Sequence, residues 1–206
     1  MPPVPKSLLQ IAGAPLNPSP LNASVLVIID AQLEYVKGSL PLQGIDAAIR
    51  EAALLLALAR KIAMPVFHIV QHAPAGRPLF AEDGPYAAIV PQLSPAPGEI
   101  VLRKTLPNAF AGTDLHELIK STGRNEIIFA GFMTHMCVSA SARAALDLKY
   151  RSTVVANATA TRDLPDPLGG MIPASVVHRT ALSELADRFA IVVRDTAALL
   201  PQQATA

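Results

Sequence analysis

The chain alternates short runs of apolar residues with longer segments in which apolar and polar positions mix. The first run, residues 24–29, is continuously apolar after Ser24 and stops at Asp30. An unbroken apolar run of this length is typical of a strand that is covered on both faces, as in a parallel sheet. Further apolar runs predict strands at residues 66–70, 100–102, 126–130, 153–156 and 190–193.

The mixed segments between these runs have the composition of helices. Alanine and leucine dominate residues 46–63, which stop just before Pro65. Thr113 can cap a helix that ends near Thr122, where Gly123 suits a left-handed terminus. Further helices are predicted at residues 137–150 and 174–189. Strands that alternate with helices predict a three-layer α/β fold, with a mainly parallel sheet between helices.

The segments outside this alternation are rich in proline and glycine. Residues 1–23 contain repeated prolines and little periodicity, and they predict an extended N-terminal arm. Residues 24–206 show neither a linker nor an internal repeat, so they predict a single domain. Residues 71–98 and 157–172 predict long loops, which in compact domains are often functional.

The order of the predicted elements also indicates where a ligand would bind. In open α/β sheets, ligands lie beyond the C-terminal ends of the strands. The residues directly after the predicted strands include Asp30, His72 and Lys104, together with a turn, residues 132–136, that leads to Cys137. We therefore expect the chemistry of this protein at that edge of the sheet.

The amino-acid composition limits the kinds of binding partner and the cellular compartment that we expect for this protein. The chain has 206 residues, of which 51% are hydrophobic and 16% charged, and its formal net charge is +1. This balance is typical of a globular protein and offers no strong field to nucleic acid or an anionic membrane. We find neither an apolar run of about 18 residues nor the apolar stretch of a secretory signal. A single cysteine cannot form an internal disulfide, and we expect a cytoplasmic protein.

Cys137 is the only cysteine and the candidate nucleophile. Its plainer interpretation is a small buried apolar residue. However, it follows a strand and a short turn, and it opens a predicted helix. A helix N-terminus favours negative charge, so this position is expected to lower the thiol pKa and to offer backbone N–H groups to an oxyanion.

Asp30 and Lys104 are the other two candidates, each at the end of a predicted strand. A carboxylate at the end of a buried strand must be hydrogen-bonded or paired. Asp30 would either cap a loop or helix, or accept the thiol proton. Lys104 would either be a solvated surface group or stabilise both neighbouring anions. The three residues together make a stronger case than any one of them alone.

Three segments that contain these residues resemble the motifs of the isochorismatase-like hydrolase family, in its cysteine hydrolase branch. Residues 30–35, DAQLEY, are similar to the first motif, an Asp-x-Gln-x-x-aromatic after an apolar strand. Residues 104–115, KTLPNAFAGTDL, resemble the second, a Lys followed by Ala-Phe and Thr-x-Leu. Residues 131–138, GFMTHMCV, resemble the third. The similarity covers about residues 22–195 in the family's order and spacing.

The resemblance implies a six-stranded parallel sheet and a catalytic triad of Asp30, Lys104 and Cys137. It also implies a cis peptide bond between Phe132 and Met133, with the N–H groups of Met133 and Cys137 forming an oxyanion hole. The implied activity is cleavage of a C–N bond in a small amide, carbamoyl or ureido compound through a thioester, without a cofactor.

Several positions depart from the family pattern, and these departures narrow the range of activities that we expect. Metal-binding nicotinamidases of the family carry an Asp-x-His element and a further His after the first motif, whereas residues 36–50 contain no His. We therefore predict no metal and argue against nicotinamidase activity. Isochorismatases proper lack the cysteine, so Cys137 argues against enol-ether hydrolysis. Asn157-Ala158 stands where the family often has Asp-Ala. An ester or enol-ether hydrolase, and a silent member that acts in binding or assembly, remain alternatives.

Several further residues are candidates for binding the small-molecule substrate: Gln32, Tyr35, His72, Phe80, Phe110, Thr134 and His135. The aromatic side chains among them are equally compatible with core packing. Among the other polar residues, we expect His68 to be structural, His116 to lie on the surface, and His178 and Arg179 to serve either role. The family's habit, the N-terminal arm and the apolar tail at residues 197–200 favour a homo-oligomer, either a dimer or a tetramer.

Overall fold

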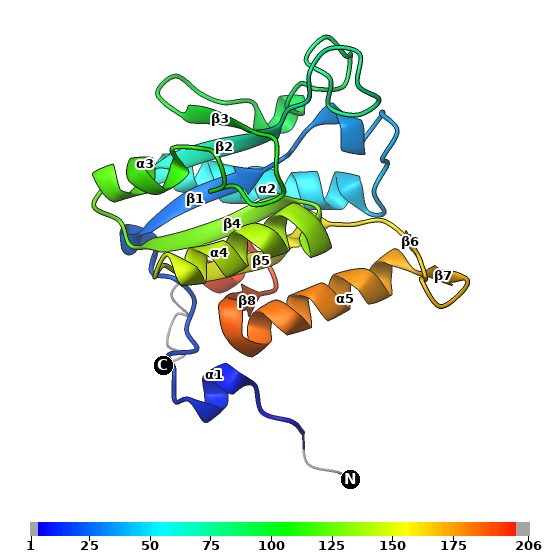
Figure 1. Cartoon of the computed structure of the whole chain (residues 1–206). Coiled ribbons are helices and arrows are strands. Elements are labelled where there is room, and N and C mark those ends of the chain that lie inside the picture. The colour runs from blue at the N-terminus through cyan, green and yellow to red at the C-terminus, as the bar shows by residue number, and fades with distance from the viewer. Residues whose placement is uncertain (1–3, 201–206) are drawn as a thin grey trace.

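The computed structural model describes residues 4–200. One sheet contains six parallel strands in the order β3-β2-β1-β4-β5-β8, which confirms the predicted fold class (Figure 1). The strands are β1 Ser24–Ile29, β2 Val66–Gln71, β3 Ile100–Lys104, β4 Glu126–Phe132, β5 Arg151–Ala160 and β8 Ile191–Val193. A separate antiparallel pair is formed by β6 Leu164–Pro165 and β7 Met171–Ile172.

Helices cover both faces of this sheet, as the alternation of elements predicts (Figure 1). The long helix α2 packs on one face, and α3, α4 and the end of α5 pack on the other. The helices are α1 Leu8–Ile11, α2 Ile45–Lys61, α3 Leu115–Ser121, α4 Ser139–Asp147 and α5 Ala174–Glu184.

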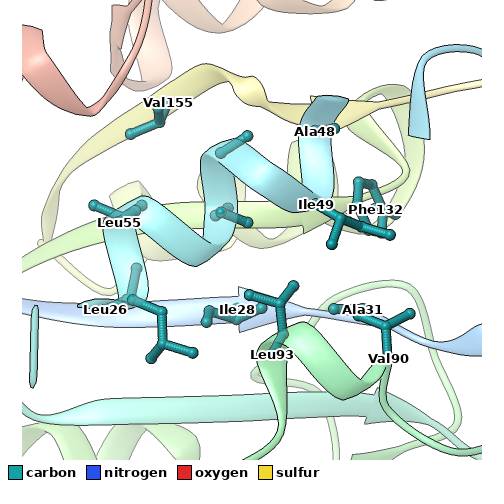
Figure 2. Close-up of a cluster of buried hydrophobic side chains, with 14 of the residues drawn as sticks. Leu26, Ile28, Ala31, Ala48, Ile49, Leu55, Val90, Leu93, Phe132 and Val155 are labelled. Carbon is teal, nitrogen blue, oxygen red and sulfur yellow. The ribbon is translucent and has the colours of Figure 1, made fainter. Parts of the chain in front are cut away.

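The central strand β1 supplies both hydrophobic layers. Side chains alternate between the two faces of a strand, so every second residue of β1 points to the same helix layer. Figure 2 shows Leu26 and Ile28 in one cluster with Ile49 and Leu55 of α2. The intervening residues of β1 belong to the second cluster, on the side of α3 and α4: Val25, Val27 and Ile29. Burial of both faces explains why the sequence of this strand is continuously apolar.

The position of β1 also sets the place of the site. The chain winds from β1 through β2 to β3 at one edge and then returns to add β4 on the other side of β1. Ligands of open α/β sheets bind at this kind of reversal, beyond the C-terminal ends of the strands. Asp30 follows β1 there, and the turn to Cys137 follows β4.

Four strands, β2 to β5, are longer than the sequence predicts, and the extensions of β3 and β5 have a visible cause. β3 extends to Lys104, because Gln71 and Lys104 are partners in the β2–β3 register. β5 extends to Ala160, because Thr159 and Ala160 pair with the end of β4 after a shift in register. The first four residues of the predicted loop 157–172 are therefore strand.

The helix predicted from residue 137 has an irregular first turn. Residues Thr134–Val138 form a π-helical turn, and the regular helix α4 begins at Ser139. The helix predicted at 174–189 similarly ends in a π-helical turn, Leu185–Phe189. Cys137 thus lies in the irregular turn before α4, whereas the sequence places it at the helix start. π-Helical turns of this kind are frequent at functional sites.

The N-terminal arm is not extended throughout. Ser7 caps the short helix α1 by accepting a hydrogen bond from the backbone N–H of Gln10, 3.2 Å away. The N–H of Leu8 also donates to the carboxylate of Asp187, at 2.8 Å, so the arm contacts its own chain. In the predicted apolar tail, Leu199 packs into the cluster around α2. Residues 1–3 and 201–206 lie outside the described part of the chain.

Candidate active site

Three ionisable side chains meet where β1, β3 and β4 end. The ammonium nitrogen Nζ of Lys104 lies 2.7 Å from Oδ2 of Asp30 and 3.4 Å from Sγ of Cys137. All three residues are buried, and even Cys137 has only 5% of its surface exposed. The structure therefore brings together the three residues that the sequence selects from distant positions.

The backbone conformation at Asp30 and the order of the strands determine where the charged side chains of Asp30 and Lys104 lie. Asp30 directly follows β1 with a φ of 49°, a left-handed conformation that aspartate tolerates better than most residues. Lys104 ends β3, two strands away, and its side chain must pass the end of β2 to reach the carboxylate. There Nζ also donates a hydrogen bond to Oε1 of Gln71, at 2.7 Å. Sequence reasoning missed this role for Gln71, because no local signal marks it.

The electrostatics of Cys137 differ from the sequence prediction. Burial and, next, the negative charge of Asp30 raise the pKa of the Cys137 thiol to about 12, against the opposing charge of Lys104. The expectation that a helix N-terminus lowers this pKa is therefore wrong for the resting site. The thiol holds its proton at neutral pH, so nucleophilic attack requires a proton acceptor beside it.

Asp30 has the properties of that acceptor. Burial raises the pKa of its carboxyl group, and the charge of Lys104 opposes this shift. Asp30 and the Cys137 thiol are close enough to influence one another by a side-chain hydrogen bond. Nζ of Lys104 lies 2.7 Å from Oδ2, whereas Oδ1 has no hydrogen-bond partner within residues 4–200, so a lone pair is available for the thiol proton.

The turn between β4 and α4 carries Cys137. The peptide bond between Phe132 and Met133 is cis. The carbonyl oxygen of Met133 accepts hydrogen bonds from the N–H groups of Met136, at 3.0 Å, and Val138, at 3.2 Å. These bonds close the turn around Cys137. The role of the Met133 and Cys137 N–H groups as an oxyanion hole stays a prediction.

Two histidines take part in hydrogen bonds that connect this turn to neighbouring elements. Nδ1 of His178, in α5, lies 2.9 Å from the hydroxyl of Thr134, and Nδ1 of His135 lies 2.6 Å from the hydroxyl of Thr161. Burial lowers the pKa of both histidines. In each pair, a neutral imidazole can accept a hydrogen bond that the threonine hydroxyl donates. His178 and Thr161 also line a cavity of about 560 Å³ between α2, β5 and α5.

The aromatic candidates separate into two groups. Tyr35 is buried and meets Phe80 and Phe132 edge to face, with ring centroids 5.4 Å and 5.9 Å apart. Burial and, next, the charge of Asp30 raise the pKa of Tyr35, so this ring lies near the carboxylate. Phe110 instead stacks on Tyr150 at 6.2 Å in the cluster under α3 and α4. Tyr35 and Phe80 remain candidates for the pocket wall, whereas we expect Phe110 to support the core.

The other polar candidates have different surroundings. The amide nitrogen of Gln32 donates to the carbonyls of Gln71, at 3.0 Å, and Ala87, at 2.8 Å, and its oxygen accepts from the N–H of Gln71. We therefore expect Gln32 to hold the loop after β2 in place rather than to bind substrate. His72 is partly exposed, with Nε2 3.7 Å from a carboxylate oxygen of Glu82.

The remaining histidines have structural surroundings. His68 is buried, and its Nε2 lies 2.8 Å from Glu99, which also pairs with Arg60 at 2.7 Å. Nδ1 of His116 lies 2.9 Å from the hydroxyl of Tyr150, so this predicted surface residue is partly packed. These contacts agree with the structural role predicted for His68.

Within residues 4–200, no group of three or more histidine, cysteine or acidic side chains is arranged to hold a metal ion. None of the helices in the same residues combines the length and apolar character needed to cross a bilayer.

Comparisons with known proteins agree with this geometry. A family model described as the isochorismatase domain matches residues 24–197. A crystal structure of an isochorismatase from Pseudomonas putida KT2440 matches with a TM-score of 0.90 and 41% identity, covering 96% of this chain and 100% of that one. A secreted isochorismatase effector of Verticillium dahliae is 36% identical over 187 residues, 91% of this chain and 96% of the relative. A maleamate amidohydrolase of Pseudomonas putida is 33% identical over 147 residues, 63% of this chain and 68% of the relative.

Proposed function

The chain belongs to the isochorismatase family of hydrolases, and we propose that it is a cysteine-dependent amidohydrolase. It would cleave a C–N bond of a small amide, carbamoyl or ureido compound through a thioester. Amidohydrolases occur among its relatives, including the one that acts on maleamate. The observation that carries the proposal is the buried cluster of Asp30, Lys104 and Cys137, in which Nζ lies within 3.4 Å of both partners' reactive atoms.

The first half of the reaction forms the thioester. Asp30 accepts the proton of the Cys137 thiol, and the thiolate attacks the carbonyl carbon of the amide. The carbonyl oxygen becomes an oxyanion, for which we propose the N–H groups of Met133 and Cys137 as donors. The intermediate then collapses, the C–N bond breaks, and the leaving nitrogen takes the proton from Asp30. The products of this half are an amine or ammonia and a Cys137 thioester.

The second half releases the acid. Asp30, again a carboxylate, accepts a proton from water as the oxygen of that water attacks the thioester carbonyl. Collapse of the second intermediate breaks the C–S bond, and the proton returns from Asp30 to the sulfur. Lys104 keeps its positive charge throughout and stabilises whichever of the two neighbours is negative. The residues end in their starting protonation states, so the cycle is complete.

A panel of small amides tests the proposal. We expect the purified wild-type protein to release ammonia or amine from at least one member of a panel of amides, carbamoyl and ureido compounds. Coupled detection of ammonia and mass spectrometry of the acid product would measure this release. The amidohydrolase assignment is wrong if the protein leaves every C–N compound intact while it hydrolyses an ester or an enol ether.

Hydrolysis of an enol ether is the second candidate. The names of two similar relatives favour it, because both the Pseudomonas structure and the Verticillium effector are described as isochorismatases. A nucleophilic cysteine is not needed when water adds to a protonated enol ether. The arrangement of Cys137 beside a base and a cation therefore favours the amidohydrolase.

The variant Asp30→Asn should separate thiol reactivity from turnover. The substituted amide would no longer carry the negative charge that raises the pKa of Cys137, whereas Lys104 would still stabilise the thiolate. A pKa below the wild-type value of about 12 means a larger thiolate fraction at pH 8, so alkylation by iodoacetamide should accelerate about tenfold for each unit of decrease. Amide hydrolysis should instead fall by about 10²–10⁴-fold, because the proton acceptor and donor is lost.

Intact mass spectrometry would follow the alkylation, and ammonia release would follow the hydrolysis. The sole cysteine makes the labelling unambiguous. Retained turnover would contradict the role of Asp30 as the base, and slower labelling would contradict the effect of its charge on the thiol pKa. Asp166→Asn is a suitable control because it removes one carboxylate in the hairpin loop between β6 and β7.

Self-association is a further proposal. Apolar side chains are exposed on the arm and on the β6–β7 hairpin, where Val4 has 88% and Leu168 96% of its surface exposed. Both segments lie outside the sheet and could pack on another copy of the chain (Figure 1).

A further inference from the structure

The ammonium group of Lys104 has three N–H donors, and each of them has an acceptor in the active site. Nζ lies 2.7 Å from Oδ2 of Asp30, 2.7 Å from Oε1 of Gln71 and 3.4 Å from Sγ of Cys137. Lys104 has only 1% of its surface exposed, so bulk solvent does not compete for these donors. The reaction described above uses the first and the third acceptor, and it gives Gln71 no part.

The orientation of the Gln71 amide follows from the chemistry of its partner. An ammonium group only donates hydrogen bonds, so the amide atom that faces Nζ is the oxygen. The distance from Nζ to this oxygen equals the distance from Nζ to the carboxylate of Asp30, and it is typical of a charge-assisted hydrogen bond. Gln71 therefore holds the ammonium group as closely as Asp30 does, from the end of β2.

The backbone of Gln71 is itself held by Gln32. The N–H of Gln71 donates to Oε1 of Gln32 at 2.8 Å, and the carbonyl oxygen of Gln71 accepts from Nε2 of Gln32 at 3.0 Å. Gln71 and Lys104 are also partners in the β2–β3 register. The next residue, His72, donates its N–H to the carbonyl oxygen of Lys104 at 2.8 Å. The side chains of Gln71 and Lys104 thus leave from two hydrogen-bonded strand ends, which fixes their relative position.

Two acceptors together determine where the third N–H group points. An ammonium group that is bound to one acceptor can still rotate about that hydrogen bond. A second acceptor removes this freedom, and the tetrahedral geometry of the nitrogen then sets the direction of the remaining N–H group. With Asp30 and Gln71 as the two acceptors, the remaining N–H group is directed to the sulfur of Cys137.

The contact between Nζ and the sulfur matters because the resting thiol is hard to ionise. Burial and, next, the charge of Asp30 raise the pKa of the Cys137 thiol to about 12, and the charge of Lys104 opposes this rise. Coulombic attraction weakens with distance, and a hydrogen bond weakens when its donor is misaligned. An ammonium group that could turn or move away from the sulfur would therefore stabilise the thiolate less.

We propose that Gln71 is a positioning residue that acts through Lys104, because it orients the ammonium group so that one N–H group stabilises the thiolate of Cys137. The proposal rests on the cysteine-dependent function described above, since it concerns the nucleophile of the same site. Gln71 neither transfers a proton nor forms a bond to the substrate in this role. Its loss should therefore slow the reactions of the sulfur and leave the affinity for the substrate unchanged.

Alkylation of Cys137 by iodoacetamide at pH 8 tests the proposal, because the rate follows the thiolate fraction. Gln71→Leu removes the acceptor and keeps an uncharged side chain of similar size. We expect this variant to be labelled about tenfold more slowly than the wild type, which corresponds to a rise of about one unit in the thiol pKa. Intact mass spectrometry measures the rate, and thermal unfolding shows whether the variant is folded. An unchanged labelling rate in the folded variant would overturn the proposal.

A double-mutant cycle distinguishes positioning from a general structural effect. In a Lys104→Met background there is no ammonium group to orient, so adding Gln71→Leu should change the labelling rate by less than about twofold. Equal slowing by Gln71→Leu in both backgrounds would overturn the proposal, because Gln71 would then act without Lys104.

A shorter amide at the same position keeps the proposal testable if Lys104→Met does not fold, since that change leaves the buried carboxylate of Asp30 without its cation. Gln71→Asn has the same functional group, but it is one methylene shorter and cannot reach Nζ from the same backbone position. We expect Gln71→Asn to be labelled as slowly as Gln71→Leu. Labelling at the wild-type rate would overturn the proposal.

Gln92→Leu is the matched control, because it removes an exposed amide from the short 3₁₀ helix Pro91–Leu93. It should be labelled at the wild-type rate, and slowing equal to that of Gln71→Leu would overturn the proposal.

Amide hydrolysis extends the test to turnover. For any amide that the wild type hydrolyses, we expect Gln71→Leu to lower kcat by about the same factor as the labelling rate and to leave KM close to the wild-type value. A raised KM with unchanged kcat would overturn the proposal, because Gln71 would then bind the substrate. If no amide is hydrolysed, the labelling rates still decide the role of Gln71 independently of the proposed function.

Discussion

Replacing Cys137 with serine is expected to lower amide hydrolysis by about 10⁴-fold or more, because the reaction loses its nucleophile. A serine hydroxyl at this position would lie beside the same base and cation, but it is far less acidic than a thiol and a weaker nucleophile. The expected result therefore depends on the chemistry of sulfur and not on the loss of packing. Ammonia release under saturating substrate measures it directly.

Stability measurements must accompany this variant. The change removes little volume, and the hydroxyl can contact Lys104 Nζ, which lies 3.4 Å from the sulfur in the wild type. We expect the melting temperature to remain within a few degrees of the wild-type value. Mass spectrometry of the wild type after rapid quenching should show the acyl adduct, which Cys137→Ser should lack. A folded variant that keeps more than a tenth of the activity would rule out the thioester route and favour direct attack by water.

Replacing Gly131 with alanine is expected to prevent native folding. Gly131 pairs with Ile29 across the β4–β1 ladder and has a φ of 109°, which side-chain-bearing residues rarely adopt. A Cβ atom there would lie 2.0 Å from the carbonyl oxygen and 2.6 Å from the nitrogen of Ile29. Both atoms belong to the buried central strand, so neither can move without breaking the ladder. We expect a loss of more than about 4 kcal/mol in the free energy of unfolding.

Gly123 provides the matched control. Its φ of 71° is also left-handed, but a Cβ atom at this position would meet nothing within 4 Å. Gly123→Ala should therefore cost only about 1–2 kcal/mol, which is the strain of the backbone conformation alone. Urea unfolding and circular dichroism would measure both variants. Equal stability of the two alanine variants would show that contact with Ile29 is not decisive.

The fold could be predicted from the sequence because its strongest signals are local. A strand buried on both faces must be continuously apolar, and residues 24–29 meet that condition. The positions of Asp30 and Lys104 follow from the rule that strand ends gather at one edge of a parallel sheet. Their closeness does not follow from that rule, because Lys104 must cross the end of β2 to reach Asp30.

The electrostatics of the site could not be predicted in the same way. The sequence places Cys137 after a turn and suggests a lowered thiol pKa, but burial and the charge of Asp30 raise it. Both causes depend on residues far away in the chain. The contact of His178 with Thr134 likewise does not follow from the sequence, because it depends on how α5 packs beside the turn that carries Cys137.

The side chains of β1 point alternately to the two helix layers, so the position of the catalytic carboxylate depends on the register of this strand. A displacement of β1 by one residue would exchange Leu26 and Ile28 with their neighbours and would carry the carboxylate of Asp30 to the opposite side of the sheet. Partly ordered molecules that keep their helices but lose this alignment would be inert. On heating, the rate of substrate hydrolysis would therefore fall to zero before the helical circular dichroism signal is lost. The hydrolysis rate is then a more sensitive measure of native structure than the helix content.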